Sequence, residues 1–461
     1  MTVGILYLLA TLGLVQGLKL MGEPSRARTG NLLAAASALL ALVAVTWASY
    51  RPESVGAHLI LLLLLLVAAT VIGRVWSYRV PMTSMPQLVS IFNALGGLSA
   101  VLLGVNQVLA MGILPANRFG STVLMLGVAL GGLAFTGSMV AYLKLDGRKL
   151  PRGNRLHRLG ARMLLLGMLL ALALLWVLPD AFGSLALLLM LVAVASLVYG
   201  ILFTLPIGGA DMPVLIALLN ALTGVATLLA GLIFKDPVML IGGILVGATG
   251  LILTVQMSKA MNRTLRSVLA GSIKSARGGA AETEEQVRPV TAVETASMLA
   301  FGKHIAIVPG YGMAVSQAQQ AVYEMQGLLQ RMGAGVHYII HPVAGRMPGH
   351  MNVLLAEANV PYASIHGMEE VNDHMDRYDV VLVIGANDVV NPAAESDPDS
   401  SIHGMPIIRA YKAKQVVVFK RGMAKGYSGE RNLLFERPNC RVLFGDAKES
   451  VKAIIDELKR I

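Results

Sequence analysis

The stretch Val308-Pro309-Gly310-Tyr311-Gly312-Met313-Ala314-Val315 continues directly from an apolar run that begins at His304. A strand followed by a G-x-G turn and a helix is typical of dinucleotide-binding folds. There the first glycine makes the turn, and the second lets the backbone approach a pyrophosphate. The turn alone is a weak signal, because a tight strand–helix connection without a ligand uses the same residues.

Strand-like and helix-like segments alternate around this turn. Apolar runs predict strands at 304–308, 336–341, 379–385, 415–419 and 441–444. Amphipathic patterns predict helices at 292–301, 313–332, 349–358 and 447–460. This alternation predicts a doubly wound parallel sheet, a Rossmann-like α/β domain, over residues 291–461.

Other segments fall at the carboxyl ends of predicted strands, where open α/β sheets bind ligands. Gly385-Ala386-Asn387-Asp388 ends the central strand, and we expect a ligand or coupling role for Asp388 rather than an Asx turn alone. Lys420-Arg421-Gly422 ends another strand. Two cations there can pair with a 2′-phosphate, which favours NADP over NAD unless they are an ordinary solvated pair. The segment 341–350 lacks the acidic residue that an NAD-selective site carries after its second strand.

The chain before residue 260 consists mainly of long apolar runs. Of its 461 residues, 55% are hydrophobic and 14% charged, which is unusual for a soluble protein. A membrane span needs about 20 apolar residues. By that measure we expect nine spans, at 2–20, 31–49, 55–73, 86–110, 121–143, 161–179, 183–205, 212–234 and 238–258. The expected domains are therefore 1–260 in the membrane, 261–290 as a linker whose small polar residues lie at 272–290, and 291–461 outside it.

The net charge of +11 comes largely from one set of loops. Lysines and arginines cluster after the first, third, fifth and ninth spans, whereas the alternate loops hold only Arg51, Arg118 and Lys235. The positive-inside rule then places the N-terminus outside and the C-terminal domain in the cytoplasm, so nucleic-acid binding is not needed to explain the charge. The first span has no basic flank or cleavage site and is expected to be retained. The single cysteine, Cys440, excludes disulfides and Cys-ligated zinc or iron–sulfur centres within the chain, and we predict no metal site.

Two stretches of the membrane part repeat. Residues 85–97 align without gaps to 212–224, each starting Met-Pro and each carrying an asparagine, Asn93 or Asn220, two turns into the span. Such repeats often place a transport site at their interface. Hydrogen bonding between helices is an equally good explanation of the two asparagines. No Asp, Glu, Lys, Arg or His lies near the middle of any expected span, although a proton relay normally uses such a group.

Together these residues resemble the β subunit of proton-translocating NAD(P) transhydrogenase over nearly the whole chain. The resemblance rests on the segments 208–213, 259–263, 309–315, 341–352, 383–388, 420–421 and 426–427. It implies that the C-terminal domain, called domain III, binds NADP(H). Partner alpha subunits would carry the NAD(H) domain and further transmembrane helices, and the whole would be a dimer of heteromers in the bacterial inner membrane. Hydride would pass directly between the two nicotinamides and would be coupled to proton movement.

The resemblance also implies roles for particular residues. Those expected to bind NADP(H) are Gly310, Tyr311, Gly312, Met313, Ala344, Gly345, Arg346, Met347, Gly385, Ala386, Asn387, Asp388, Lys420, Arg421, Gly422, Gly426 and Tyr427. Lys420 and Arg421 would hold the 2′-phosphate, and Gly426 with Tyr427 would form a loop over the cofactor. Those expected on the proton path are Asn93, Ser138, Asp211 and Asn220. Asp388, Lys259 and Arg263 would couple the domains, although the positive-inside rule alone also explains Lys259 and Arg263.

One position departs from the family's pattern. Some relatives have a proton-relaying histidine where this chain has Asn93, which cannot titrate. We therefore expect a titratable residue of a partner's helix near Asn93 or Asn220. The alternative function is a channel or transporter gated by a cytoplasmic NADP(H)-sensing domain, but no filter motif or ring of pore charges supports it. A single-chain NADPH reductase would need a second cofactor motif, and none is present.

Overall fold

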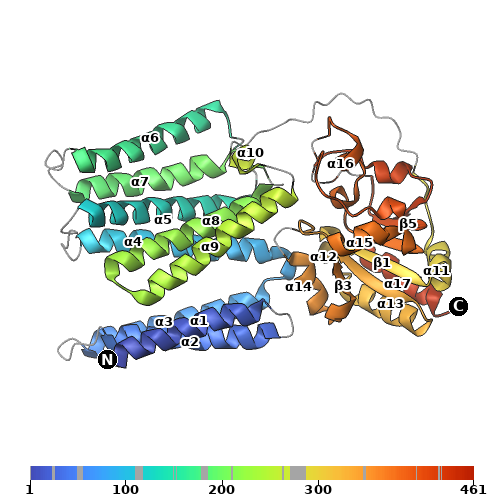
Figure 1. Cartoon of the computed structure of the whole chain (residues 1–461), viewed down its shortest axis with the longest axis horizontal. Helices are drawn as coiled ribbons and strands as arrows, with labels where there is room; N and C mark the ends of the chain where they lie inside the picture. Colours follow the sequence, from blue (N-terminus) through green and yellow to red (C-terminus); the bar gives the residue numbers. More distant parts are fainter. Residues whose placement is uncertain are drawn as a thin grey trace. The chain divides into compact units, whose positions relative to one another are not determined.

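The computed structural model describes residues 2–22, 26–48, 55–109, 118–148, 150–151, 153–177, 185–208, 211–261, 264–269, 287–345, 349–400, 402–423, 426 and 428–461. The chain divides into two compact units, Met1–Pro206 with Leu215–Thr254 and Ile207–Val214 with Val255–Ile461. Figure 1 labels the α-helices and some of the strands. The helices of the membrane part and the α/β domain are described separately below.

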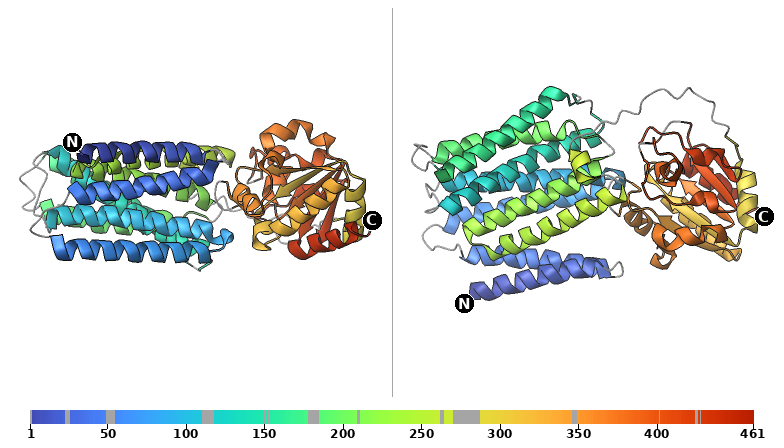
Figure 2. Two further views of the ribbon diagram at one scale, coloured as in Figure 1. Left: turned by 90° about the horizontal axis from the view of Figure 1, so that it is seen from below. Right: turned by 45° about the horizontal axis from the view of Figure 1, so that its top comes forward.

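Nine helices in the described residues are long and apolar enough to cross a membrane, as the sequence predicts. They lie side by side in Figure 2. Their bounds are α1 Thr2–Met21, α2 Ala27–Ala48, α3 Val55–Arg79, α4 Met85–Leu109, α5 Arg118–Leu145, α6 Arg155–Val177, α7 Leu185–Thr204, α8 Met212–Phe234 and α9 Pro237–Ala260. Several extend beyond the apolar run, since the backbone stays helical through basic residues such as Arg74 in α3 and Arg158 in α6. A short helix, α10 (Leu265–Leu269), follows α9.

Glycines bring several membrane helices into close contact. A Cβ on Gly97 of α4 would lie 2.6 Å from the carbonyl oxygen of Gly131 in α5. A Cβ on Gly243 of α9 would lie 2.7 Å from the carbonyl oxygen of Gly224 in α8. Small residues at helix crossings let backbones approach, and the resulting van der Waals contact is one of the interactions that hold helices together in lipid.

The α/β domain has a sheet of six parallel strands in the order β3-β2-β1-β4-β5-β6. The strands are β1 His304–Pro309, β2 Gly335–Ile340, β3 Ile365–Gly367, β4 Val380–Ile384, β5 Gln415–Lys420 and β6 Cys440–Phe444. This is the strand order of Rossmann folds. The prediction of a doubly wound parallel sheet is therefore confirmed, although β3 was not predicted from the sequence.

Helices cover both faces of the sheet and enclose two apolar cores. One core holds side chains of α11 (Ala292–Phe301), α13 (Gln319–Arg331), α14 (His350–Glu357) and α17 (Ala447–Leu458). The other holds side chains of α15 (Met368–Val371) and of the 3-10 helices η6 (Asn372–Arg377), η7 (Asp388–Val390), η8 (Ala410–Lys412) and η9 (Leu433–Glu436). The remaining short helices are η3 Met82–Ser84, η5 Tyr362–Ser364 and α16 Ala393–Ser396.

The helix expected at 313–332 is two helices, so that prediction was wrong. The first, α12 (Tyr311–Val315), ends where the Gln317 N–H donates to Ala314 O and the Ala318 N–H donates to Met313 O. This pair of bonds is a Schellman motif, and Gln317 adopts the left-handed conformation that it requires, with a φ of 51°. The second helix, α13, then starts at Gln319.

Candidate functional site

The two glycine turns that the sequence shows separately form one structure at the switch point of the sheet. Strands β1 and β4 are neighbours, and the chain leaves them toward opposite edges of the sheet. The Gly310 N–H donates to Ile384 O, and the Gly312 N–H donates to Gly385 O, each over 2.9 Å. Ligands of open α/β sheets bind in the crevice at this point. The turn after β1 and residues 385–388 after β4 are therefore placed together where a dinucleotide is expected.

Side chains are excluded where these two turns meet. A Cβ on Gly310 would lie 2.5 Å from the carbonyl carbon of Gly385, and one on Gly312 would lie 2.7 Å from its Cα. Gly385 itself has a φ of +74°, which favours glycine. The glycine pattern is thus required for backbone packing as well as for any approach of a ligand. Within the turn, Met313 and Ala314 are buried, while Tyr311 is half-buried.

Asp388 is held by a later segment of the chain. Its carboxylate accepts hydrogen bonds from the backbone N–H and the hydroxyl of Ser428, at 2.9 and 2.8 Å, and from Asn387 Nδ2 at 3.2 Å. Gly426 lies so close that a Cβ there would be 2.5 Å from Asp388 Oδ1. Tyr427 lies outside the described residues. The loop expected to fold over the cofactor is therefore hydrogen-bonded to Asp388, the residue expected to couple the domains.

Two asparagines make further hydrogen bonds between the segment after β4 and the segment that follows Ser428. Asn432 Nδ2 donates to the carbonyl and side-chain oxygens of Asn387, each at 3.1 Å. Asn391, which is fully buried, donates to Arg431 O at 2.9 Å and accepts from the Leu433 N–H at 3.1 Å. The sequence did not single out Asn391, Ser428 or Asn432. Their only signal was the preference of Asn and Ser for bonding to nearby backbone.

The basic pair lies at the carboxyl end of β5, one strand away from β4. Lys420 is the last residue of β5, and its Nζ lies 4.5 Å from the centre of the Phe435 ring, a cation–π contact. Arg421 and Gly422 follow and are exposed. The parallel sheet thus puts these cations at the same edge as Asp388 and the glycine turn, where the sequence predicted a 2′-phosphate contact.

The turn after β2 is shaped by His341, whose side chain is 1% exposed. Its Nε2 lies 2.7 Å from Pro406 O, and its Nδ1 accepts from the Val343 N–H at 3.1 Å, so the neutral ring donates through Nε2. Burial lowers the pKa of His341 to about 4, opposed by the bond to Pro406. This turn carries Ala344, which is buried, and Gly345, with a φ of +109°. Arg346 and Met347 lie outside the described residues.

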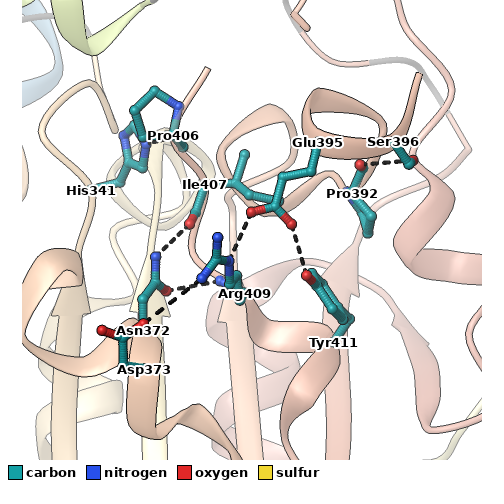
Figure 3. Close-up of polar contacts among 10 residues, drawn as sticks. All are labelled: His341, Asn372, Asp373, Pro392, Glu395, Ser396, Pro406, Ile407, Arg409 and Tyr411. Atoms are coloured by element: carbon teal, nitrogen blue, oxygen red, sulfur yellow. Dashed lines mark hydrogen bonds and ion pairs between the residues drawn. The ribbon is translucent and has the colours of Figure 1, made fainter. Parts of the chain in front are cut away.

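A polar network holds the segment that leads into β5 (Figure 3). Asn372 donates to Ile407 O at 2.7 Å and accepts from the Arg409 N–H at 3.0 Å. Glu395 accepts from the Arg409 Nε–H and from the Tyr411 hydroxyl, each at 2.7 Å. Because Pro406, which accepts from His341, belongs to the same segment, the network links the turn after β2 to the start of β5.

In the membrane part, the expected proton-path residues of α4, α5 and α8 lie on packed helices. Asn93 is 5% exposed, and its Nδ2 is 3.4 Å from Ile216 O, a long hydrogen bond that ends one turn before Asn220 on α8. Ser138 is buried, and its hydroxyl has no hydrogen-bond partner in the described part of the chain. Next to it, a Cβ on Gly137 would lie 3.0 Å from Leu219.

The remaining residues of the expected path and coupling segment are described only in part. Asp211 is 7% exposed and directly precedes α8. Lys259 is exposed in the last turn of α9. Arg263 lies outside the described residues. Sequence reasoning did not identify the buried hydroxyls of Ser90 in α4 and Thr204 in α7, which, like Ser138, have no hydrogen-bond partner among the described residues.

These features define a class of protein: a multi-span membrane protein with a Rossmann-like domain whose glycine turn lies at the switch point. The profile described as NAD(P) transhydrogenase beta subunit matches residues 3–457. Two similar chains, from Rhodospirillum rubrum and from a designated strain of it, are each named NAD(P) transhydrogenase subunit beta. Each is 41% identical over 465 residues, covering 99% of this chain and 97% of the relative. The chain belongs to the NAD(P) transhydrogenase beta subunit family, as its sequence motifs indicated.

Proposed function

We propose that this chain is the NADP(H)-binding subunit of a transhydrogenase that couples hydride transfer to proton translocation. The observation that carries the proposal is the meeting of the 310–313 and 385–388 turns at the switch point, with Lys420 and Arg421 at the same edge. Family membership and the names of the relatives support NAD(P)(H) as the substrates and an alpha subunit as the partner. In this proposal residues 1–260 form the membrane domain, 261–290 the linker and 291–461 domain III, on the cytoplasmic side of a bacterial inner membrane.

The residues of the α/β domain fit a dinucleotide. The turn after β1 offers backbone at the pyrophosphate position, Ala344 and Gly345 lie in the turn after the neighbouring strand, and Lys420 with Arg421 would pair with the 2′-phosphate. When bound, NADP(H) supplies the hydride or accepts it, and the protein needs no acid or base for that step. The work of this chain is to orient the cofactor and to exclude water with the loop that Ser428 ties to Asp388.

Coupling to protons requires that protonation change the relative affinity for NADP⁺ and NADPH, an effect that is reciprocal by linkage. We assign Asp388 to the cofactor side of this linkage and Lys259 and Arg263 to the connection with the membrane. Asn93, Ser138, Asp211 and Asn220 form the proposed path. Because neither asparagine titrates, a partner's transmembrane residue supplies the central proton step. Pumping that survives removal of every ionisable intramembrane residue from the partner would disprove this assignment.

Cofactor selectivity tests the proposal directly. The full-length chain in detergent would be titrated with NADP⁺, NADPH and NAD⁺ by calorimetry, and the double variant Lys420→Ala/Arg421→Ala compared with it. We expect NADP(H) to bind tightly, NAD⁺ to bind weakly, and the double variant to lose at least about a hundredfold in NADP(H) affinity, since charge-assisted hydrogen bonds contribute about 1.5–3 kcal/mol each. The matched control is Arg331→Ala/Lys452→Ala, which removes two exposed charges from α13 and α17. Equal binding of both nucleotides, or equal losses in both double variants, would refute the 2′-phosphate assignment.

A further inference from the structure

Three histidines lie on one face of the sheet, on neighbouring strands. His304 begins β1, His337 in β2 pairs with Ala306, and His366 in β3 pairs with Ile339. Paired residues share a face, and so do residues two apart on one strand. The three imidazoles therefore lie on the face that α15 and η6 cover. A parallel sheet buried on both faces normally carries apolar side chains there, so this row of imidazoles is a departure.

The three histidines line a cavity of about 610 Å³. Its other walls come from α15, η6 and the residue after η6, and they consist of Glu370, Val371, His374, Arg377 and Tyr378. Cavities that hold small molecules range over about 300–1,000 Å³. The position differs from that of the nucleotide turns: His304 is the first residue of β1, whereas the glycine turn follows its last residue. The size and place of the cavity fit a separate small-molecule site.

The polar side chains that line this cavity bond to one another, and some of their atoms can make further hydrogen bonds. His337 Nδ1 lies 2.9 Å from the Tyr378 hydroxyl, and the rings of His337 and His366 are 4.8 Å apart. His366 Nδ1 lies 3.3 Å from Glu370 Oε2. His366 Nε2 is buried and has no hydrogen-bond partner among the described residues. With Nδ1 directed at Glu370, the buried Nε2 of His366 is left to bond to a ligand.

The charges that line the cavity favour an anion. Among the described residues that line it, Arg377 is a fixed cation and Glu370 is the only carboxylate. Burial is the larger cause that lowers the pKa of His337, and the charges of His366 and His304 lower it further. A bound anion would offset the effect of these charges. A metal is the other natural ligand of clustered imidazoles. Within the described ranges, however, no group of three or more His, Cys, Asp or Glu side chains is placed to hold one.

We propose that this cavity binds a small multivalent oxyanion, a phosphate or a phosphate monoester, between the imidazoles of His337 and His366 and the guanidinium of Arg377. Binding tightens as His337 takes up a proton. Arginine supplies a planar pair of donors that suits phosphate oxygens, and the imidazolium N–H groups add donors whose number depends on pH. The site is independent of the proposed nucleotide site and would exist even if that assignment failed.

Calorimetry on the full-length chain in detergent tests this proposal. Inorganic phosphate, glycerol phosphate and sulfate would be titrated separately at pH 5.8 and 7.8. Sulfate is the control for ligand charge, because it stays a dianion throughout this range. We expect a site that binds sulfate at least about tenfold more tightly at pH 5.8, since a proton taken up contributes up to tenfold per pH unit. The phosphate and monoester arms distinguish a free ion from a group carried on a larger molecule.

Single variants locate the site. Arg377→Gln and His337→Gln should each weaken sulfate binding at least about tenfold at pH 5.8, whereas Lys420→Ala/Arg421→Ala should leave it unchanged. Arg377 is exposed, so its variant tests the site even if His337→Gln unfolds the domain. Three results would overturn the proposal: no binding at either pH, binding lost with Lys420 and Arg421, or affinity independent of pH. Tight Zn²⁺ binding that requires His337 and excludes sulfate would also overturn it.

Discussion

Protonation of His341 should set how the α/β domain loses stability in mild acid. The ring is 1% exposed, and burial lowers its pKa from 6.5 to about 4. Because the folded-state pKa lies below the unfolded one, the neutral ring contributes stability that is complete above pH 6.5. That contribution is lost as the pH falls from 6.5 toward 4. At pH 4.5 the loss amounts to about 2.5 kcal/mol, or roughly 80-fold in the opening equilibrium.

The variant His341→Gln isolates this effect. A glutamine amide can donate to Pro406 O and accept from the Val343 N–H, the two bonds that His341 makes, but it does not titrate. Other groups that respond to acid are common to both proteins. Asp379 is one of them: hydrogen bonds from Lys414 and from the backbone of His304 lower its pKa to about 2, so its contribution is lost mainly below this window.

The single cysteine provides the assay. Cys440 is fully buried in β6 of the α/β domain, and burial raises its pKa to about 12, so a thiol reagent reaches it only when the domain opens. The full-length chain would be labelled with an aromatic disulfide that reacts in acid, at pH 7 and pH 4.5, with a small thiol peptide as the reference for intrinsic reactivity. We expect the labelling rate of the wild type to rise about 80-fold more than that of His341→Gln. An equal rise in both proteins would refute the assignment of this acid sensitivity to His341.

Two further predictions concern the switch point. Gly312→Ala places a Cβ 2.7 Å from the backbone of the turn after β4, so we expect NADP(H) binding to weaken by more than about a hundredfold and Cys440 labelling to become faster. The control Gly327→Ala, in α13 and with nothing within 4 Å of the added Cβ, should leave both unchanged. Ser428→Ala removes a half-buried hydroxyl bond to Asp388 and should weaken NADP(H) binding by about 5- to 20-fold, measured by calorimetry. Unchanged affinity would show that the attachment of Ser428 to Asp388 does not act on the cofactor.

The sequence predicts the elements whose signals are local. Strands β1, β4 and β5 are continuous apolar runs flanked by turn residues, and each was found within a residue or two of its predicted bounds. Strand β3 was missed because Ile365-His366-Gly367 contains one apolar residue, and its place is fixed by pairing with β2. The break after α12 was missed for a related reason. A Schellman motif is usually recognised in a sequence by a Gly or Asn at its left-handed position, but here that residue is Gln317.

In the candidate site, too, the sequence predicts the local motifs but not the contacts that depend on the fold. Glycines in the turns after β1 and β4 are visible as separate motifs, but only the strand order shows that Gly310 and Gly385 must touch. The bond between Ser428 and Asp388 spans 40 residues and carries no local pattern. The histidine cavity was missed for the same reason, since its imidazoles come from three strands whose register no spacing rule reveals.

Two asparagines that occupy equivalent positions in the internal repeat have different surroundings in the structure. Identical spacing made Asn93 and Asn220 equivalent, and a symmetric pair would suggest equal roles on the path. In the structure Asn93 is 5% exposed and bonds across to α8, whereas Asn220 is only half-buried and has no hydrogen-bond partner among the described residues. An asparagine committed to a helix contact is less free to bind a passing water or a partner's side chain than one whose amide is unoccupied. If the proposed path is right, Asn220 is therefore the freer of the two to meet a partner's titrating residue, whereas the amide of Asn93 bonds α4 to α8.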